Sequence, residues 1–250
     1  MKYVRDLTGR FPSRPHYEPS ELDAECDRVL TEFFMETAGK VTYPVSTDNL
    51  TLLIERYVES LDLYADLSAE GPGVEGVTTF RRGKKPIVRI AQELASDARR
   101  EVRLRTTLSH EFGHVHFHNA LFQMDNIALD LFDSSRDTTR VTAQRATPGA
   151  EVAKCKRDHM VTAPQADWME WQAGYVCGAV LMPRRAMSKF VQKFCDRRHV
   201  TGTVSLTTPH GRDLVGAVAE HFFASTDAAR VRLEVLKLVS KAHDGSGLFA

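Results

Sequence analysis

The first part of the chain carries apolar residues at the three-to-four-residue spacing of a helix. Between about Pro19 and Gly39 this spacing predicts a helix, and Gly39 is a plausible residue to end it. The apolar positions of this run are Leu22, Cys26, Val29, Leu30 and Phe33. The stretch Ser46-Thr47-Asp48 can cap a second helix, because apolar residues recur at helical spacing from Leu50 to Val58.

Three shorter apolar runs follow, and each has the length of a strand. They span Leu61 to Leu67, Val74 to Phe80 and Pro86 to Ala91. Turn-forming sequences separate them, with Gly71-Pro72-Gly73 in the first link and a glycine among basic residues in the second. Links as short as these favour antiparallel pairing, so the pattern predicts a small antiparallel sheet.

Helical spacing returns in the second half of the chain. We expect a long helix from about Asp97 to Asn119 and another from about Asp167 to Leu181, where Met182-Pro183 ends it. Between these helices, residues 120–165 contain several turn-forming stretches, and we interpret them as an insertion that is mostly loop with some helix. Most of the remaining sequence is helical in pattern, with a break at Thr207-Thr208-Pro209.

This order of elements predicts an α+β fold with two domains. The first covers residues 1–190 and includes the insertion at about 120–165, and the second is a helical region at residues 191–250. Within the second domain, the break at residues 224–227 separates two helical runs, which gives a helix-turn-helix-like arrangement as one interpretation. The apolar face formed by Leu233, Leu236 and Val239 favours packing or substrate docking over DNA binding. Its basic residues are few, namely Arg230, Arg232, Lys237 and Lys241.

The composition is that of an ordinary soluble protein. Of the 250 residues, 42% are hydrophobic and 26% are charged, and 33 basic residues balance 33 acidic ones. Zero formal net charge argues against a broad electrostatic surface for nucleic acid or an anionic membrane. The sequence shows neither a signal-peptide core nor an apolar run of about 18 residues, and its four cysteines follow no disulfide pattern. We therefore expect a cytoplasmic protein with no membrane attachment.

One motif carries recognisable chemistry, His110-Glu111-Phe112-Gly113-His114. Two histidines four residues apart lie on one face of a helix, about one turn from each other, and can bind the same zinc ion. Glu111 is rotated by about 100° from His110, so it is poorly placed as a ligand. It can instead reach a water molecule on the metal, whose pKa zinc lowers to roughly 7, and act as general base. The alternative is a chance match on a solvated helix.

The residues around this motif support the first interpretation. A glycine inside a helix costs about 1 kcal/mol relative to alanine, so Gly113 is better explained by close packing of another segment. His116 and His118 extend the histidine run, and we expect both to lie off the face of His110 and His114 in structural or partly solvated positions.

A catalytic zinc ion needs a third protein ligand, and Glu170 is the best candidate. It lies in a predicted helix made almost entirely of apolar or small residues, where a carboxylate needs a partner such as a metal. Gly174 and Gly178, one and two turns further on, would allow this helix to approach another closely. The alternative is an acidic residue that stabilises the start of the helix, a role for which Asp167 is better placed.

These motifs, taken in order, resemble those of the ImmA/IrrE family of metallopeptidases over about residues 40–190. The matching segments are Arg105-Thr106-Thr107, His110 to His114, His118, Glu170-x-Gln172-Ala173 and Val180-Leu181-Met182-Pro183. The resemblance implies a zincin-like core in which Glu170 completes the zinc site. It also implies cleavage of a helix-turn-helix transcriptional repressor, often encoded beside the protease on a mobile element. The long spacing between His114 and Glu170 departs from the family pattern, as does Gly174, where the family often has Asn or Asp.

Three functions remain to be compared. The leading hypothesis is a zinc-dependent endopeptidase that binds an extended substrate along an edge strand among residues 61–91, with Tyr175 and His210 as candidate oxyanion donors. The second is a non-proteolytic regulator that binds a protein partner or DNA through its C-terminal helices. The third is a metal hydrolase acting on a small amide.

Two further sequence patterns have a simpler structural explanation than a functional site. Cys155-x-x-x-His159 and Cys195-x-x-x-His199 share a spacing that could form a structural zinc site, but buried free cysteines are the simpler interpretation. The basic stretch from Arg184 to His199 is interpreted as a solvated helix face.

Overall fold

The computed structural model describes residues 1–124, 150–156 and 167–240, and its architecture is mixed α+β, as the sequence predicts. The chain forms two compact units. The first consists of residues 1–16 and 47–174, and the second of residues 17–46 and 175–250. This division does not follow the predicted boundary after residue 190, and it cuts helix α7 (Trp168–Leu181) near its middle.

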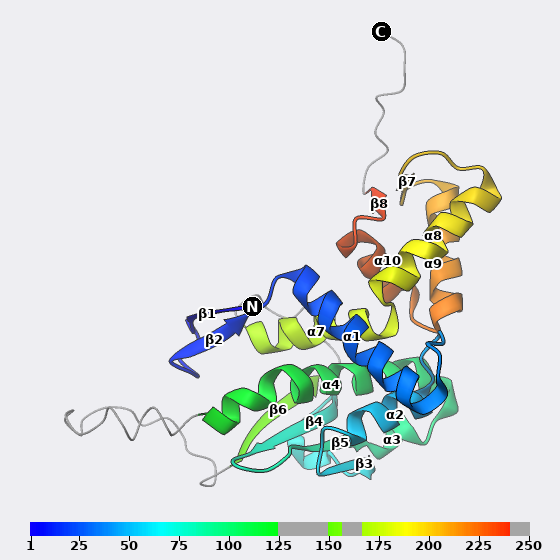
Figure 1. Ribbon diagram of the computed structural model, residues 1–250. Helices are drawn as coiled ribbons and strands as arrows, with labels where there is room; N and C mark the ends of the chain where they lie inside the picture. The colour runs from blue at the N-terminus through cyan, green and yellow to red at the C-terminus, as the bar shows by residue number, and fades with distance from the viewer. Residues whose placement is uncertain (125–149, 157–166, 241–250) are drawn as a thin grey trace. The chain divides into compact units, whose positions relative to one another are not determined.

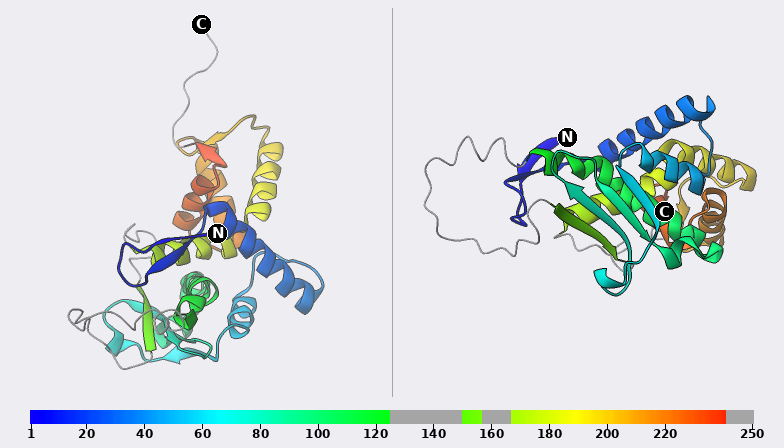
Figure 2. Two further views of the ribbon diagram at one scale, coloured as in Figure 1. Left: turned by 60° about the vertical axis from the view of Figure 1, so that its left-hand side comes forward. Right: turned by 90° about the horizontal axis from the view of Figure 1, so that it is seen from below.

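A four-stranded sheet forms the centre of the first unit. Its strands are β3 (Ser60–Ala65), β5 (Ile87–Ala91), β4 (Val74–Arg81) and β6 (Ala150–Lys156), in that spatial order. The right-hand view of Figure 2 shows them side by side. The three strands predicted from the sequence are confirmed.

The prediction of a purely antiparallel sheet is wrong, because β3 and β5 are parallel. Strand β4 is antiparallel to β5 on one side and to β6 on the other. Each short link does reverse the chain, as expected. However, the first link, which contains the 3-10 turn Ser68–Glu70, leaves space between β3 and β4, and β5 fills it. Two reversals bring β5 back parallel to β3.

Strand β6 was not predicted, since its residues fall in the segment interpreted as loop and helix. The sequence from Ala150 to Lys156 is rich in alanine and charged residues, which have low intrinsic preference for strands. Its pairing runs along β4 from Val74↔Lys156 to Arg81↔Ala150, so a tertiary contact determines its conformation. The turn-forming stretches of the predicted insertion at residues 133–139 and 147–149, which we interpret as loop, lie outside the described residues.

Helices cover this sheet and contribute the candidate site. Helix α2 (Thr47–Glu55) and the long helix α4 (Glu101–Met124) were both predicted, and α4 packs against β4 and α2 (Figure 1). The short helix α3 (Gln92–Ala95) and a 3-10 turn at Ala98–Arg100 precede α4 and delay its start beyond the predicted Asp97.

The first unit also contains an unpredicted N-terminal hairpin of β1 (Lys2–Arg5) and β2 (Ser13–His16). Asp6, in the loop of this hairpin, accepts hydrogen bonds from the backbone N–H groups of Thr8 and Phe11. Phe11 anchors the loop in an apolar cluster with residues of β4, α4 and α7. The other buried members of the cluster are Phe80, Leu121, Trp168 and Met169.

The second unit is largely helical. It contains α1 (Pro19–Ala38), the second half of α7, α8 (Arg184–Arg198), α9 (Pro209–Phe222) and α10 (Thr226–Val235). A two-residue parallel pair of β7 (Val204–Ser205) and β8 (Val239–Ser240) completes it. The predicted helix from Pro19 is confirmed, and it ends at Gly39, whose φ of 67° lies in the left-handed region that glycine adopts easily. Its apolar face is buried.

The helices were also compared with the requirements of a membrane span. In the parts of the chain that the structure describes, no helix combines the length and the apolar character needed to cross a bilayer.

Candidate metal centre

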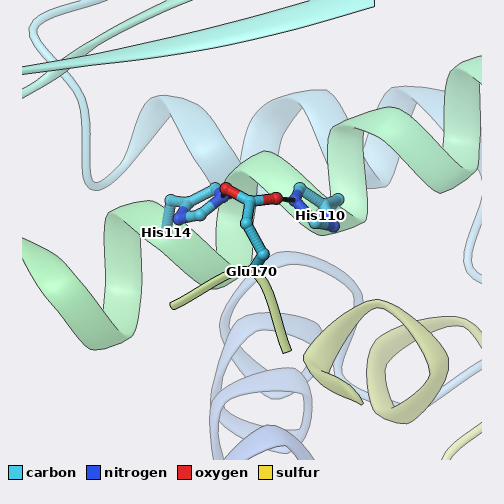
Figure 3. Close-up of side chains that lie close together, drawn as sticks. All are labelled: His110, His114 and Glu170. Carbon is cyan, nitrogen blue, oxygen red and sulfur yellow. Dashed lines mark hydrogen bonds and ion pairs between the residues drawn. The ribbon is translucent and has the colours of Figure 1, made fainter. Parts of the chain in front are cut away.

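His110 and His114 project from successive turns of α4 toward the same point (Figure 3). Both side chains are fully buried, and their Nε2 atoms lie 3.1 Å apart. This juxtaposition follows from the helical period, which rotates residues four apart by only about 40° relative to each other. The two imidazoles therefore present one pair of nitrogen atoms to a common position.

Glu170 comes from α7 and reaches between the two histidines (Figure 3). Its Oε2 atom lies 3.1 Å from Nε2 of His110, and its Oε1 atom lies 3.2 Å from Nε2 of His114. Ligand atoms of the three residues all lie within 4.8 Å of one another, and all three residues are buried. The structure therefore brings together the three residues that the sequence proposed as ligands, in a group that could hold a metal ion.

A close crossing of α4 and α7 makes this meeting possible. A Cβ atom added at Gly113 would lie 2.8 Å from the Cα atom of Ala173, closer than real side chains approach a backbone. The expectation that another segment packs against Gly113 is confirmed. Gly178 has a different environment, since a Cβ atom there would meet the side chain of Arg232 at an ordinary 3.5 Å.

Glu111 faces strand β4 and is fully buried. Its Oε2 atom accepts a hydrogen bond from the hydroxyl of Thr78 on that strand. Gly76 lies opposite the same carboxylate, where an added Cβ atom would come within 2.9 Å of both Glu111 Cδ and Thr107 Cγ2. Neither Thr78 nor Gly76 was predicted as a site residue. The sequence feature that could have indicated Gly76 is a glycine inside a predicted strand, because such a glycine often marks close approach of another group.

The three residues differ in their electrostatics. Burial by itself lowers the pKa of His114, but the charge of Glu170 and its hydrogen bond raise that pKa overall, so a metal ion would have to displace a proton there. Burial by itself raises the pKa of Glu170, but the charge on His114 and hydrogen bonds with both histidines outweigh burial and lower that pKa overall. Glu170 is therefore a carboxylate at neutral pH. Burial lowers the pKa of His110, so its imidazole is neutral and able to bind a metal through Nε2.

His118 departs from the sequence-based expectation. It was expected off the face of His110 and His114, but it lies directly beyond His114, with their Nδ1 atoms 3.1 Å apart. His118 is fully buried, and its Nε2 atom is 3.0 Å from Oε1 of Gln172 on α7. The expectation overlooked that His118 is itself four residues from His114, so the same helical period applies. His116 is half-buried as expected, and its ring stacks on Phe112.

The two candidate oxyanion donors belong to the second unit. The hydroxyl of Tyr175, a candidate oxyanion donor, donates to Oδ2 of Asp23 at 3.0 Å within the second unit. His210, the other candidate, lies in the first turn of α9, also in the second unit. In the sheet formed by the described residues, β4 and β5 are interior strands, so among residues 61–91 only β3 lies at an edge.

The alternative of a Cys/His zinc site receives no support among the described residues. The side chain of Cys155 and all of His159 lie outside them. Cys195 and His199 lie at the end of α8, and the metal-binding groups found in the described ranges do not include them.

The basic residues of α10 are already engaged. Arg232 is 3% exposed, forms an ion pair with Asp23 and donates from Nε to the backbone oxygen of Met182. Arg230 pairs with Glu234 at 3.1 Å.

Comparison with known proteins identifies no relative of this chain. No protein-family model matches the chain, and no curated protein is similar to it in sequence. The interpretation of the site therefore rests on its own geometry and chemistry.

Proposed function

We propose that the protein is a zinc-dependent endopeptidase with a zincin-like catalytic core. The observation that carries this proposal is the buried trio of His110, His114 and Glu170 beside a fourth buried residue, Glu111. In a tetrahedral site with metal–ligand distances of about 2.0–2.1 Å, neighbouring ligand atoms lie about 3.3 Å apart. The two Nε2 atoms lie 3.1 Å apart, close to this value, and each has a different oxygen of Glu170 at 3.1–3.2 Å. With one ligand atom taken from each residue, the three atoms lie within 4.8 Å of one another. Two imidazoles and one carboxylate are also a ligand set of catalytic zinc sites.

Each residue then has a defined task in peptide hydrolysis. His110, His114 and Glu170 would hold the zinc ion, which would supply Lewis-acid activation of water and of the scissile carbonyl. Glu111 accepts a proton from the attacking water and passes it to the amine of the leaving peptide. Thr78 fixes one oxygen of this carboxylate, and Gly76 leaves the space in which the carboxylate lies. A carboxylate held in one orientation needs little reorganisation during proton transfer.

The substrate proposal comes from the resemblance to the ImmA/IrrE family. It names a helix-turn-helix transcriptional repressor, encoded near the protease on a mobile element and cleaved in the cytoplasm. An extended peptide could add to an exposed strand at an edge of the four-stranded sheet, where backbone hydrogen bonds would hold it largely independently of sequence.

The alternative of a DNA-binding regulator is less well supported. It needs basic side chains on the C-terminal helices that are free to contact phosphates. Arg232 is buried in an ion pair, and Arg230 pairs with an acidic neighbour on its own helix. These contacts favour a structural role for the basic residues of α10.

The decisive experiment compares Glu111→Gln with His110→Ala. The first variant keeps the three metal ligands, so it should retain about one zinc per chain while losing at least ~10²-fold in cleavage rate. The second should lose both zinc and cleavage. Any helix-turn-helix protein encoded beside this one would serve as the substrate, and fragments would be identified by mass spectrometry. Undiminished cleavage by Glu111→Gln would exclude the proposed base, and cleavage that persists without metal would exclude the proposed class.

A further inference from the structure

The side chains behind His114 form a continuous hydrogen-bonded chain that leads away from the candidate metal. His118 follows His114, with 3.1 Å between their Nδ1 atoms, and Gln172 follows His118, with 3.0 Å between Oε1 and Nε2. The side-chain amide of Gln172 then donates to the backbone oxygen of Pro15 in β2 at 3.2 Å. All three side chains are at most 1% exposed, so water does not compete for these bonds.

We propose that His118 is a positioning residue that fixes the tautomer and orientation of His114 through a one-directional chain from His114 to Pro15. This inference rests on the proposed function, because it takes His114 as a metal ligand.

In each hydrogen bond from His114 to Pro15, the donor and the acceptor can be assigned from the two ends of this series. Nε2 of His114 lies beside His110 and Glu170, so this atom is the one that faces the metal. A neutral imidazole that binds through Nε2 carries its proton on Nδ1 and donates it there. His118 must therefore accept at Nδ1, which puts its own proton on Nε2.

The end of the chain at Gln172 and Pro15 requires the same tautomer of His118. The oxygen of Pro15 can only accept, so the NH₂ group of Gln172 points to Pro15 and the carbonyl oxygen of Gln172 points to His118. That oxygen also can only accept, which again requires a proton on Nε2 of His118. Both ends thus select the same neutral tautomer of His118, and every donor in the chain meets an acceptor.

The surroundings of His118 keep its ring in place. The ring makes a T-shaped contact with Trp168, with 5.5 Å between centroids and an angle of 85° between planes. The guanidinium of Arg14 lies 5.2 Å from the centre of the same indole. The N-terminal hairpin therefore contributes twice to the support of His114, through the oxygen of Pro15 and through Arg14.

The two ligand histidines differ in this support. In the described part of the chain, Nδ1 of His110 is buried without a hydrogen-bond partner, whereas Nδ1 of His114 has His118. Residues that hydrogen-bond to a ligand histidine typically contribute about 10- to 100-fold to metal affinity. We therefore expect His118 to set how tightly the protein holds its metal.

Zinc affinity of the full-length chain, measured by competition with a chromophoric chelator, tests this role. His118→Leu removes the acceptor and should weaken zinc binding about 10- to 100-fold. His118→Asn places an oxygen near the former Nδ1 position, so it should recover most of the lost affinity although it cannot reach Gln172. The matched control is His116→Leu, the same substitution two residues away on a ring that stacks on Phe112, and it should leave zinc affinity unchanged.

A second measurement works even where His118→Leu fails to fold. Nitrogen-15 NMR of the zinc-loaded wild-type chain reports which ring nitrogen of each histidine carries the proton. The expected result is a proton on Nδ1 of His114 and on Nε2 of His118, with signals assigned from the Asn variant. A proton on Nδ1 of His118, or wild-type zinc affinity in a folded His118→Leu variant, would overturn the inference.

These outcomes are separate from those that decide the proposed function. A chain that binds zinc with the expected tautomers but cleaves no peptide would retain the positioning role and lose the endopeptidase assignment. A chain that cleaves its substrate, but whose zinc affinity does not change on substitution of His118, would retain the endopeptidase assignment and lose the positioning role.

Discussion

Gly113 of α4 and Ala173 of α7 are packed so closely that a methyl group on Gly113 would lie 2.8 Å from the Cα atom of Ala173. Both positions are adjacent to site residues, since Gly113 precedes His114 and Ala173 lies three residues after Glu170. The separation of the two helices at this crossing therefore determines whether Glu170 reaches the two histidines.

The first prediction concerns this crossing. Gly113→Ala should destabilise the protein by about 1–3 kcal/mol, because overpacking outweighs the roughly 1 kcal/mol by which alanine favours a helix. It should also weaken zinc binding, since displaced helices carry Glu170 away from His110. Urea denaturation and zinc competition measure the two effects. The matched control is Gly216→Ala in α9, where an added Cβ atom meets nothing within 4 Å and alanine should stabilise by about 0.5–1 kcal/mol.

The second prediction concerns the hydroxyl that Thr78 donates to Glu111. Thr78→Val keeps the shape of the side chain and removes this hydrogen bond. We expect kcat to fall about 10-fold with zinc content unchanged, because the variant disturbs the base and leaves the ligands intact. Thr78→Ser, which retains the hydroxyl, should recover most of the rate. A Thr78→Val enzyme with wild-type kcat would show that the bond has no role in catalysis.

The same residues show how far the sequence alone can predict such a site. His110, Glu111 and His114 are local, since one helical period determines their relative positions. Glu170 is 56 residues beyond His114, and it was predicted because a carboxylate in an apolar helix needs a partner. The position of His118 is equally local, because His118 is four residues from His114, and the prediction that it lies off the face of His114 was wrong.

The pairing of strands that are distant in the sequence could not be predicted from the sequence. Strand β6 has a weak intrinsic preference for extended structure, and its partner β4 lies about 75 residues earlier in the chain. The parallel pairing of β3 with β5 is another case, because link length determines chain reversal but not which strand becomes the neighbour. Thr78 and Gly76 approach Glu111 because β4 packs against α4, and the sequence pattern does not predict this long-range contact.

The third prediction uses Asp6 to test the N-terminal hairpin. Burial alone raises the pKa of this carboxyl group, but hydrogen bonds from the backbone and side chain of Thr8 and from the backbone of Phe11 lower it overall. A lowered folded-state pKa stabilises the protein above the unfolded value of about 3.9, and this contribution disappears as the pH falls through the folded-state pKa.

Asp6→Asn should therefore lower the free energy of unfolding by about 1.5–3 kcal/mol at pH 7, the usual value of hydrogen bonds to a charged group. The difference from wild type should shrink as the pH falls below about 4, since only the wild type then loses its charge. Chemical denaturation at several pH values measures both quantities. A difference that is constant from pH 7 to pH 3 would mean that the charge of Asp6 makes no contribution.

The final prediction concerns the buried ion pair of the second unit. Asp23 of α1 and Arg232 of α10 are 4% and 3% exposed, and their side chains join in an ion pair. Removing one partner leaves the other charge buried, so Asp23→Leu or Arg232→Met alone should cost about 3–5 kcal/mol of unfolding free energy. The double variant replaces both charges with apolar groups and should be more stable than either single variant. A double-mutant cycle by urea denaturation measures this coupling, and Arg28→Met, which breaks an exposed pair with Glu32, is the surface control and should change stability little. If the two single costs simply add in the double variant, the charges do not stabilise each other and the packing of α1 against α10 depends on side-chain volume alone.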